Sequence, residues 1–530
     1  MTVRPITLPD VLEAIADAVP DREAVVTEDG TYTYAEVDER ATRLADHLIR
    51  NGVQPGDRVA VHALNRIEWV DAFFGVMKAR AVPINVNYRY EHDELVHVYS
   101  NSSSTYAIVG PEYVEAVEKV RADVPALRDV LVMGEQYDAA LAAASPERRD
   151  VGRSADDLYI LYTGGTTGSP KGVMWRQEDI IRAALNMSRF NAPIDSVAQL
   201  AEEAAASATP VRMVTAGPLM HGGSQWILGN SVVSGATFIL YTAKHFDPER
   251  YLDLASNAKA NALVTLGDAM ARPVAEAIAA QPDRWDLSSV YAVSNGAAPL
   301  SEAVRAQIRE ILPNCMINDS YGSSESGAAG TRLDDGSALS APRFNVGPDT
   351  MVVRGHDRTP ADVGEVGMLA RSGPIPLGYL DDEEKTAQTF FEIDGRRWVI
   401  PGDAAVVEED GVITLLGRGS VTINTGGEKV HPEEVEGVLL GHPDVADAAV
   451  VGVPHPRWGE QVTAMVELRA DAQVSGDHIR EHCRGRIADY KIPKEVLVVS
   501  SVPRTAVSKV DYRATKALAV EMLGGETAQP

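Results

Sequence analysis

Short apolar runs that end in glycine or small polar residues recur along this chain, and they restrict the fold more than any other feature. Examples are Leu158–Leu161, Ala262–Leu266 and Val290–Val293. Short runs of this kind between turn signals are typical of buried strands. Where helical patterns separate such strands, a parallel sheet covered by helices is favoured. Ligands bind beyond the carboxyl ends of the strands in such sheets, so we expect the polar loops to meet at one site.

The first part of the chain shows the same alternation. A helix is predicted over Thr33–Gly52, because Thr33 and Glu36 form a capping box and apolar residues recur along one face. Strands are predicted over Arg58–Ala63 and Val82–Val86, with a helical stretch between them. The fold class is therefore predicted to be α/β, with mixed and parallel sheets and covering helices.

The composition limits the partners of the protein. The chain has 530 residues, of which 45% are hydrophobic and 24% charged, as in a globular protein with a large core. With 49 basic and 76 acidic residues the net charge is -27, which argues against nucleic acid as a partner and against broad attachment to an anionic membrane. No apolar run is long enough to span a bilayer, so no integral membrane segment is expected.

Cysteine usage indicates the compartment. Cys315 and Cys483 are too few for a disulfide framework and are not spaced as zinc ligands. Their small number favours a reducing cytoplasm. The first residues lack the apolar segment that is typical of a signal peptide. The sequence leaves the oligomeric state open, with a homodimer as one alternative.

The stretch Tyr162–Gly172 carries the clearest ligand-binding signal. Backbone N–H groups of a glycine-rich turn form a concavity that suits an anion, and here hydroxyl groups and Lys171 add donors and a positive charge. The spacing differs from that of the common P-loop, in which Ser or Thr follows the lysine. The alternative is a flexible linker, which would lack a preceding strand and a closing lysine. The residues predicted to grip phosphate are Thr163, Gly164, Gly165, Thr166, Thr167, Gly168, Ser169 and Lys171.

The segment Asp319–Gly327 reads D-S-Y-G-S-S-E-S-G and is a second candidate. The ring of Tyr321 can stack on an aromatic base, and the neighbouring hydroxyl groups can reach phosphate. Glu325 can hold Mg²⁺, which prefers a carboxylate together with substrate phosphates. Taken alone, the segment is equally consistent with an ordinary turn.

Three single residues are candidates whose surroundings decide their role. Asp403 can accept hydrogen bonds from two ribose hydroxyl groups, although Gly-Asp turns are common. His221 follows a predicted strand and precedes two glycines, a place where histidine is more often structural or solvated. Lys509 lies near the C-terminus, where a lysine is usually a solvated charge.

Together these motifs resemble the adenylate-forming (AMP-binding) superfamily, which includes acyl-CoA synthetases, luciferases and the adenylation domains of peptide synthetases. The matching motifs keep the family's order over roughly Asp57–Thr515 and read Y-T-G-G-T-T-G-S-P-K-G, Y-G-S-S-E, P-G-D, L-L-G-R-G-S and P-R-T-A-V-S-K. The resemblance implies a large N-terminal adenylation domain over residues 1–417. It also implies a small mobile α+β domain over residues 418–530, with a hinge near Ser420.

The resemblance further implies an AMP-forming acid–thiol ligase that uses ATP, Mg²⁺ and coenzyme A. A small-molecule carboxylic acid would attack the α-phosphate of ATP, and the resulting acyl-AMP would react with coenzyme A. In this interpretation Lys509 catalyses adenylation, Glu325 holds Mg²⁺ and His221 closes the acyl pocket. The implied nucleotide and thioester-state residues, besides those of the phosphate loop, are Gly296, Asp319, Tyr321, Gly322, Ser323, Ser324, Asp403, Arg418, Gly426 and Gly427.

Four positions depart from the family's pattern. Ser324 and Pro401 stand where threonine is usual, Ser420 where the hinge has Asp or Lys, and Ser508 where glycine precedes the lysine. Ser324 keeps a hydroxyl group, so its function is expected to survive. The other three put local loop geometry in question.

The acceptor and the acid leave alternatives open. The alternatives to an acyl-CoA ligase are an acyl-AMP ligase that loads a carrier protein, a luciferase and a non-catalytic nucleotide-binding protein. The presence of Lys509 favours an enzyme. Y-T-G-G-T-T-G and Gly267–Pro273 look most like actinobacterial acyl-CoA ligases, some of which activate steroid side-chain acids and others fatty acids. The pocket is expected to be apolar, and small residues there would leave room for a bulky acid. Its expected lining is Met220, His221, Gly223, Gly296 and Gly322.

Overall fold

The structure is a computed structural model of the whole chain. The residues that the structure describes are 6–163, 169–189, 192–296, 300–333, 343–344, 349–355, 357–418, 421–425, 428–455, 459–470, 472–487, 489–505 and 510–524.

Two large sheets make up most of the molecule, one mainly parallel (sheet A) and one with an antiparallel end (sheet B). Sheet A runs in the order β14 (Gly327–Leu333), β13 (Met316–Ser323), β12 (Ala292–Asn295), β11 (Ala262–Thr265), β9 (Arg212–Thr215), β10 (Thr237–Leu240), β1 (Glu23–Val26) and β2 (Thr31–Thr33). Sheet B runs β18 (Gly378–Tyr379), β8 (Lys171–Arg176), β7 (Leu158–Thr163), β4 (Val82–Asn85), β3 (Arg58–His62), β5 (Ser104–Val109) and β6 (Asp129–Val132).

Helices cover both faces of each sheet, so the two sheets build an α/β/α/β/α sandwich. The layer between them is α1 (Leu8–Ala18), α2 (Tyr34–Arg50), α3 (Ile67–Lys78), α6 (Glu135–Ala143), α7 (Gln177–Ala184), α8 (Val197–Ala206) and α9 (Gly222–Val233), whose apolar residues share one core with both sheets. The outer layer of sheet A is α10 (Pro248–Asn257), α11 (Asp268–Ala280) and α12 (Glu302–Ile311). The outer layer of sheet B is α4 (His92–Asn101) and α5 (Val114–Asp123).

Two smaller sheets follow in the chain. Sheet C is antiparallel in its main ladder and runs β15 (Arg343–Phe344), β22 (Ile413–Arg418), β21 (Asp403–Val407), β17 (Val366–Ser372), β20 (Arg396–Val399) and β19 (Phe390–Ile393), with β16 (Thr350–Val353) on β17 and α13 (Glu383–Thr389) before β19. Sheet D runs β24 (Glu428–Val430), β23 (Ile423–Thr425), β26 (Gly459–Leu468) and β25 (Val445–His455), with β27 (Glu495–Val499) on β26.

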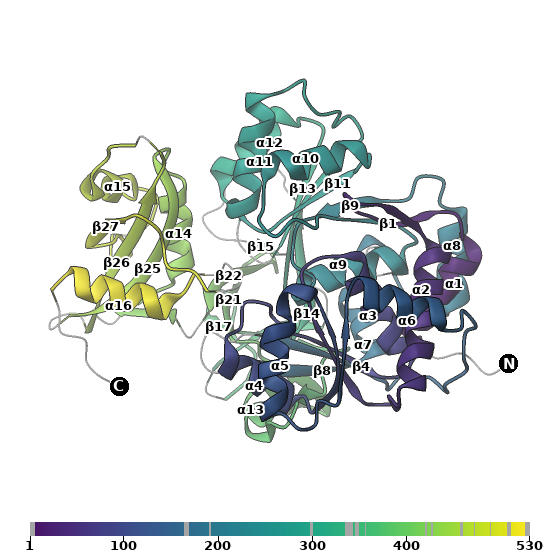
Figure 1. The fold of residues 1–530 in the computed structure, drawn as a ribbon. Helices are drawn as coiled ribbons and strands as arrows, with labels where there is room; N and C mark the ends of the chain where they lie inside the picture. The colour runs from purple at the N-terminus through teal and green to yellow at the C-terminus, as the bar shows by residue number, and fades with distance from the viewer. Residues whose placement is uncertain are drawn as a thin grey trace.

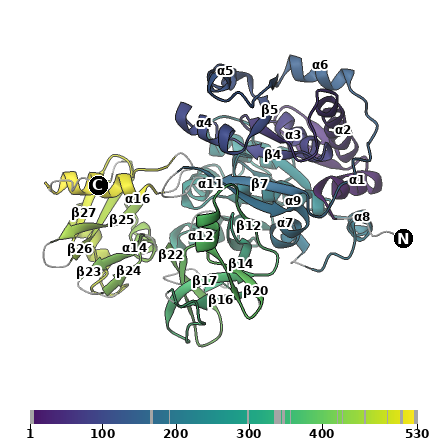
Figure 2. The ribbon, with the colours of Figure 1, turned by 90° about the horizontal axis from the view of Figure 1, so that it is seen from below.

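The elements of sheet D form a separate body at one side of the molecule (Figures 1 and 2). Its helices are α14 (Pro432–Leu440), α15 (Gly476–His482) and α16 (Tyr512–Met522). Its apolar core contains residues of this body alone. The predicted α/β class, with a large N-terminal part and a small α+β part, is therefore confirmed.

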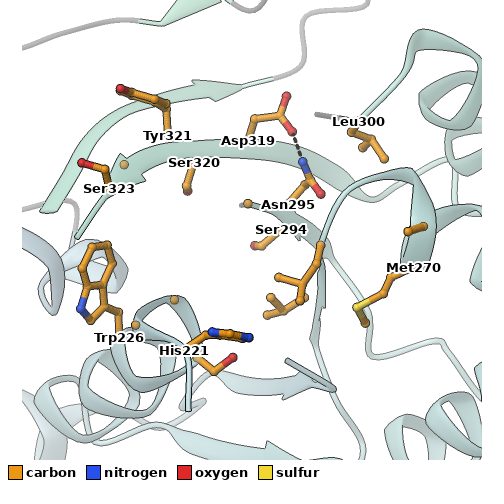
Figure 3. Close-up of a pocket in the computed structure, with 18 of the residues that line it drawn as sticks. His221, Trp226, Met270, Ser294, Asn295, Leu300, Asp319, Ser320, Tyr321 and Ser323 are labelled. Atoms are coloured by element: carbon orange, nitrogen blue, oxygen red, sulfur yellow. Dashed lines mark hydrogen bonds between the residues drawn. The ribbon is translucent and has the colours of Figure 1, made fainter. Parts of the chain in front are cut away.

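Most predicted elements lie where the local pattern placed them. Thr33 is the N-cap of α2, and the capping box with Glu36 is present. The strand predicted over Val290–Val293 lies two residues further along the chain, since β12 begins at Ala292 and ends at Asn295. Val290 instead closes a turn, because its N–H donates to the carbonyl of Leu287 at 2.9 Å. The pairing of β12 with β11 and β13 decides this register, and it brings the carboxyl ends of the strands to the pocket of Figure 3.

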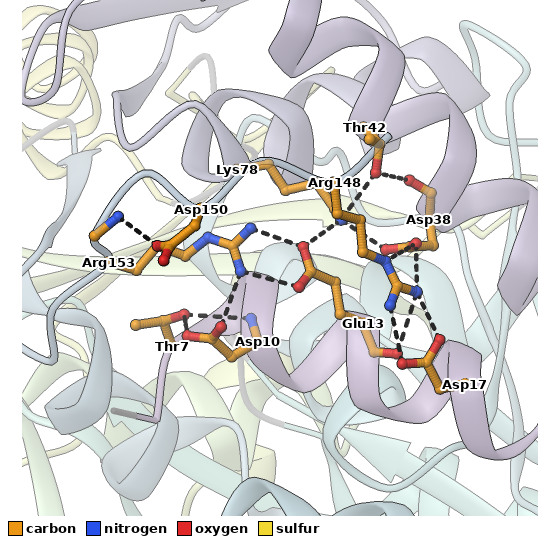
Figure 4. A network of polar contacts seen from close by, with 11 residues as sticks. Thr7, Asp10, Glu13, Asp17, Asp38, Thr42, Lys78, Arg148, Asp150 and Arg153 are labelled. Carbon is orange, nitrogen blue, oxygen red and sulfur yellow. Dashed lines mark hydrogen bonds and ion pairs between the residues drawn. The ribbon is translucent and has the colours of Figure 1, made fainter. Parts of the chain in front are cut away.

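Buried charges tie the helices of the central layer together (Figure 4). Lys78 of α3 is 3% exposed and lies 2.7 Å from carboxylate oxygens of both Glu13 in α1 and Asp38 in α2. Arg153 lies 2.7 Å from Glu13, and Arg148 lies 2.8 Å from Asp38. Buried charges are tolerated when they are paired, and the loss of one partner leaves the other uncompensated.

We predict that this cluster makes stability depend on acid pH. Burial raises the pKa of Glu13, but Arg153 and Lys78 outweigh it and lower the pKa to about 2. A carboxyl group whose pKa is lower in the folded state stabilises that state at pH values above its pKa in the unfolded state. This stabilisation is lost as the pH falls toward 2. Glu13→Gln should lower the free energy of unfolding by about 3 kcal/mol at pH 7. Urea unfolding at a series of pH values measures the difference in free energy of unfolding between the variant and the wild type. This difference should become smaller below about pH 4.5, and a difference that stays constant would contradict the argument.

Candidate functional site

A cleft of about 2650 Å³ lies where sheets A, B and C meet and extends to the body of sheet D. Its walls include the carboxyl ends of β11, β12 and β13, the start of α9 and the start of β21. Figure 3 shows His221 and Trp226 on one side of the space, with Ser294, Asn295 and Ser320 across from them. The polar loops predicted from the sequence therefore converge here.

A buried polar chain holds the strand ends in place. The side-chain N–H of Asn295 donates to Asp319 at 3.0 Å, and its oxygen accepts from the backbone N–H of Gly267 at 2.7 Å. Arg305 of α12 is 1% exposed and forms an ion pair with the other carboxylate oxygen of Asp319. Asp319 was predicted as a site residue, whereas Arg305 was missed because nothing in its helical sequence marks it. Gly296 follows Asn295 and also lines the cleft.

Tyr321 and Asp403 meet although they come from different sheets. The hydroxyl of Tyr321 on β13 donates to the carboxylate of Asp403, which begins β21. Gly402, immediately before Asp403, has φ of 106°, a left-handed conformation that favours glycine. Arg418 is the backbone partner of Asp403 in the β21–β22 ladder, and its side chain lies outside the described residues. Two residues predicted to hold one nucleotide are thus brought into contact.

Glu325 lies in the turn between β13 and β14, next to Ser323 and Ser324. The indole N–H of Trp175 donates to the carbonyl of Ser324 at 2.9 Å and so anchors the turn. The hydroxyl of Tyr379 donates to Glu325 at 3.0 Å. Within the described part of the chain, no group of three or more His, Cys, Asp or Glu side chains could hold a metal ion. A magnesium ion would therefore need substrate phosphate oxygens besides Glu325, which is the coordination that Mg²⁺ favours.

Lys171 and Thr163 lie opposite each other at the ends of β8 and β7. The ammonium group of Lys171 pairs with Asp382 and lies 5.9 Å from the ring centroid of Tyr379. Ser169 is exposed nearby. The remaining predicted residues of the phosphate loop, Gly164, Gly165, Thr166, Thr167 and Gly168, lie outside the described residues, as do Gly426, Gly427 and Lys509.

His221 is the N-cap residue of α9 and lines the cleft. The side chain of Asn85 donates to the carbonyl of Met220 at 2.7 Å and to that of Tyr162 at 2.9 Å, which ties the turn before α9 to sheet B. A Cβ atom on Gly222 would lie 2.4 Å from Leu161, so glycine permits a close approach there. A Cβ atom on Gly223 would meet no other heavy atom within 4 Å.

The cleft side of sheet A forms a largely apolar floor, in which two alanines lie between two methionines. Strand pairing aligns Met213, Ala262, Ala292 and Met316 in one row across β9, β11, β12 and β13. Val264 and Ser294 are paired in the next row, nearer the carboxyl ends. Residues of α9, among them Trp226 and Ile227, also line this part of the cleft. Alternate residues of the same strands point to the other face and pack on α10, α11 and α12.

Two matches to known families cover most of the chain. Residues 12–380 match the family described as AMP-binding enzyme, and residues 434–509 match the AMP-binding enzyme C-terminal domain. The protein therefore belongs to the AMP-binding enzyme family, and the resemblance seen in the motifs is confirmed.

Relatives of known activity are similar over nearly the whole length. The 3-oxocholest-4-en-26-oate--CoA ligase of Rhodococcus rhodochrous is 42% identical and the match covers 96% of this chain and 95% of that protein. The medium/long-chain-fatty-acid--CoA/3-oxocholest-4-en-26-oate--CoA ligase of Mycobacterium marinum is 43% identical, with 96% of each covered. Both are CoA ligases, which confirms the predicted class of enzyme.

Solved structures show the same architecture. ATP-bound MatB from Rhodopseudomonas palustris superimposes with a TM-score of 0.82 at 26% identity, covering 98% of this chain and 100% of that one. A Mycobacterium tuberculosis fatty acyl CoA synthetase superimposes with a TM-score of 0.71 at 25% identity, covering 97% and 99%. Within the described ranges, every helix is too short or too polar to cross a bilayer.

Proposed function

We propose that the protein is an ATP-dependent acyl-CoA ligase that activates a long-chain fatty acid or a steroid side-chain acid. The observation that carries the proposal is the combination of two unlike surfaces in one cleft. One end presents Tyr321, Asp403, Glu325 and Lys171, which suit a nucleotide with its phosphates. The other end is the apolar floor around Ala292, which suits a large hydrocarbon.

The first half-reaction needs positioning more than acid–base chemistry. Tyr321, Asp403 and Arg418 hold the adenosine, while Lys171 and the phosphate loop hold the phosphates. When bound beside Glu325, Mg²⁺ supplies charge neutralisation at the phosphate oxygens. Lys509 bridges carboxylate and phosphate oxygens as the acid attacks the α-phosphate and pyrophosphate leaves. Fixed groups that hold both reactants in line lower the barrier by orientation and by charge stabilisation.

The second half-reaction transfers the acyl group to coenzyme A. The domain from residue 418 onward rotates near Ser420, withdraws Lys509 and brings Gly426 and Gly427 to the site. A few backbone angles are enough for such a rotation. His221, on the opposite wall of the cleft from Ser294 in Figure 3, closes the acyl pocket until the thiol arrives.

The acid is proposed from the dimensions of the floor. Gly296 and Ala292 are four residues apart on an extended strand, so the floor reaches about 13 Å away from the nucleotide end. Small side chains at Ala262 and Ala292 leave the space above them to the ligand, and Met316, at the far end, is 43% exposed. An acid longer than the floor would therefore extend toward solvent. The activities for which the two relatives are named support the same classes of acid.

The central experiment measures pyrophosphate release from ATP and Mg²⁺ with medium-chain, long-chain, aromatic and steroid side-chain acids, each with and without coenzyme A. Sustained turnover is expected only with coenzyme A and with the long or steroid acids. A burst of pyrophosphate that coenzyme A does not prolong would indicate another acceptor, such as a carrier protein. Nucleotide binding without pyrophosphate release would indicate a non-catalytic protein.

The two free cysteines support a cytoplasmic location for this activity.

Asp403→Ala is expected to weaken ATP binding. The variant removes two acceptor oxygens for ribose, and charged hydrogen bonds of this kind correspond to a loss of about 10- to 100-fold in affinity. Titration calorimetry with ATP measures the effect. Asp403→Asn keeps one acceptor oxygen, so its affinity for ATP should lie between those of the wild type and of Asp403→Ala. An unchanged affinity in Asp403→Ala would remove the ribose assignment.

Ala292→Phe is expected to exclude large acids while sparing short ones. The ring would fill the space above the floor, so kcat/KM for long-chain and steroid acids should fall about 100-fold or more, while that for a short-chain acid changes little. Overpacking can cost about 1–3 kcal/mol of stability, so thermal unfolding of the variant is recorded alongside. Equal losses with all acids would place the acyl group elsewhere in the cleft.

A further inference from the structure

Two residues that the motif comparison did not single out connect the expected phosphate lysine with the expected metal carboxylate. The hydroxyl of Tyr379 donates to Glu325 at 3.0 Å, and the ring of the same tyrosine lies 5.9 Å from the ammonium group of Lys171. Asp382, three residues later, forms an ion pair with Lys171. Lys171 and Glu325 therefore share one supporting segment, which we call the 379–382 segment.

The 379–382 segment is held rigidly against sheet B. Tyr379 pairs with Val173 in the β18–β8 ladder and is 7% exposed. The backbone N–H of Leu380 donates to the carbonyl of Gly172 at 2.8 Å, directly beside Lys171. Asp381 takes φ of 51°, a left-handed conformation that is uncommon for residues other than glycine and is tolerated by Asp and Asn. The geometry of Tyr379 and Asp382 is thus set before any ligand binds.

Asp382 has a second anchor that does not involve Lys171. It is the N-cap of α13, and its other carboxylate oxygen accepts from the backbone N–H of Lys385 at 2.9 Å. The carboxylate therefore stays in place when the lysine leaves it. The hydrogen bond from Lys171, followed by that from the backbone of Lys385, lowers the pKa of Asp382, so the group is ionised at neutral pH.

The ion pair is suited to exchange. The side chains of Lys171 and Asp382 are 35% and 29% exposed, and ion pairs with this access to water contribute little to stability. A phosphate group carries more negative charge than one carboxylate and offers several acceptor oxygens, so it competes for the ammonium group.

We propose that Tyr379 and Asp382 are positioning residues for the nucleotide half of the reaction. Tyr379 orients the Glu325 carboxylate for Mg²⁺. Asp382 holds the ammonium group of Lys171 until the phosphates of ATP replace the Asp382 carboxylate as its partner. This inference rests on the proposed function, since it assigns supports to the same ATP site. It extends that function by naming the groups that keep Lys171 and Glu325 aligned while the site holds no nucleotide.

Tyr379→Phe tests the first part, because it keeps the ring and its packing and removes only the hydroxyl. Residues that orient a metal ligand typically change metal affinity about 10- to 100-fold when replaced. Binding of Mn²⁺ to the enzyme–ATP complex, followed by electron paramagnetic resonance without acid or coenzyme A, should weaken about 10-fold. The affinity for metal-free ATP and the melting temperature should stay unchanged. Unchanged Mn²⁺ binding, or a lowered melting temperature alone, would reduce Tyr379 to a packing role.

Asp382→Asn tests the second part, because asparagine caps helices as well as aspartate but carries no charge. Lys171 then has no carboxylate to leave, so ATP and pyrophosphate should bind about 3- to 10-fold more tightly in calorimetry at low salt. Asp381→Asn is the matched control, since it removes the same charge one residue away and keeps a residue that tolerates the left-handed conformation. Equal tightening in both variants would show a general charge effect and overturn the exchange.

The two failures can be told apart. Both binding experiments need only nucleotide and metal ion, so a wild-type protein that binds neither would contradict the proposed function itself. A wild type that binds Mn²⁺ and ATP, with variants that bind them equally well, would contradict only the roles of Tyr379 and Asp382.

Discussion

The ion pair between Arg305 and Asp319, with Asn295 beside it, is the constraint on which the site depends. It joins α12 to β13 and β12 at the carboxyl end of sheet A, where the polar loops begin. Arg305 is almost fully buried, and removing one partner of a buried pair typically costs about 3–5 kcal/mol. Because Tyr321 is two residues beyond Asp319, this pair also sets where the tyrosine ring lies.

The end of the cleft that we propose to bind the nucleotide is assembled from separate sheets. Tyr321 of sheet A contacts Asp403 of sheet C, and Tyr379 at the edge of sheet B contacts Glu325 in the turn after β13. Each contact crosses more than fifty positions of sequence, so the site exists only when the sheets are docked. Stability and ATP binding are therefore expected to respond together to changes at these junctions.

The side chains along each strand of sheet A point alternately to its two faces, and each face has its own purpose. One face packs large apolar side chains on α10, α11 and α12, while the other presents Ala262, Ala292 and Ser294 to the cleft. Because neighbouring residues of a strand point to opposite faces, the cleft face can change in size without disturbing the packed face. This separation would let the proposed acyl pocket change in size within one fold.

Local features could be predicted from the sequence alone: the capped helix at Thr33, the short buried strands and the order of the motifs. These depend on neighbouring residues, whose hydrophobic pattern and turn chemistry are readable along the chain. The start of β12, the partner of Asp319 and the contacts of Tyr379 and Asp382 became visible only in the folded chain. Strand register and buried ion pairs join residues far apart in sequence, and no local pattern records which distant residue will complete them.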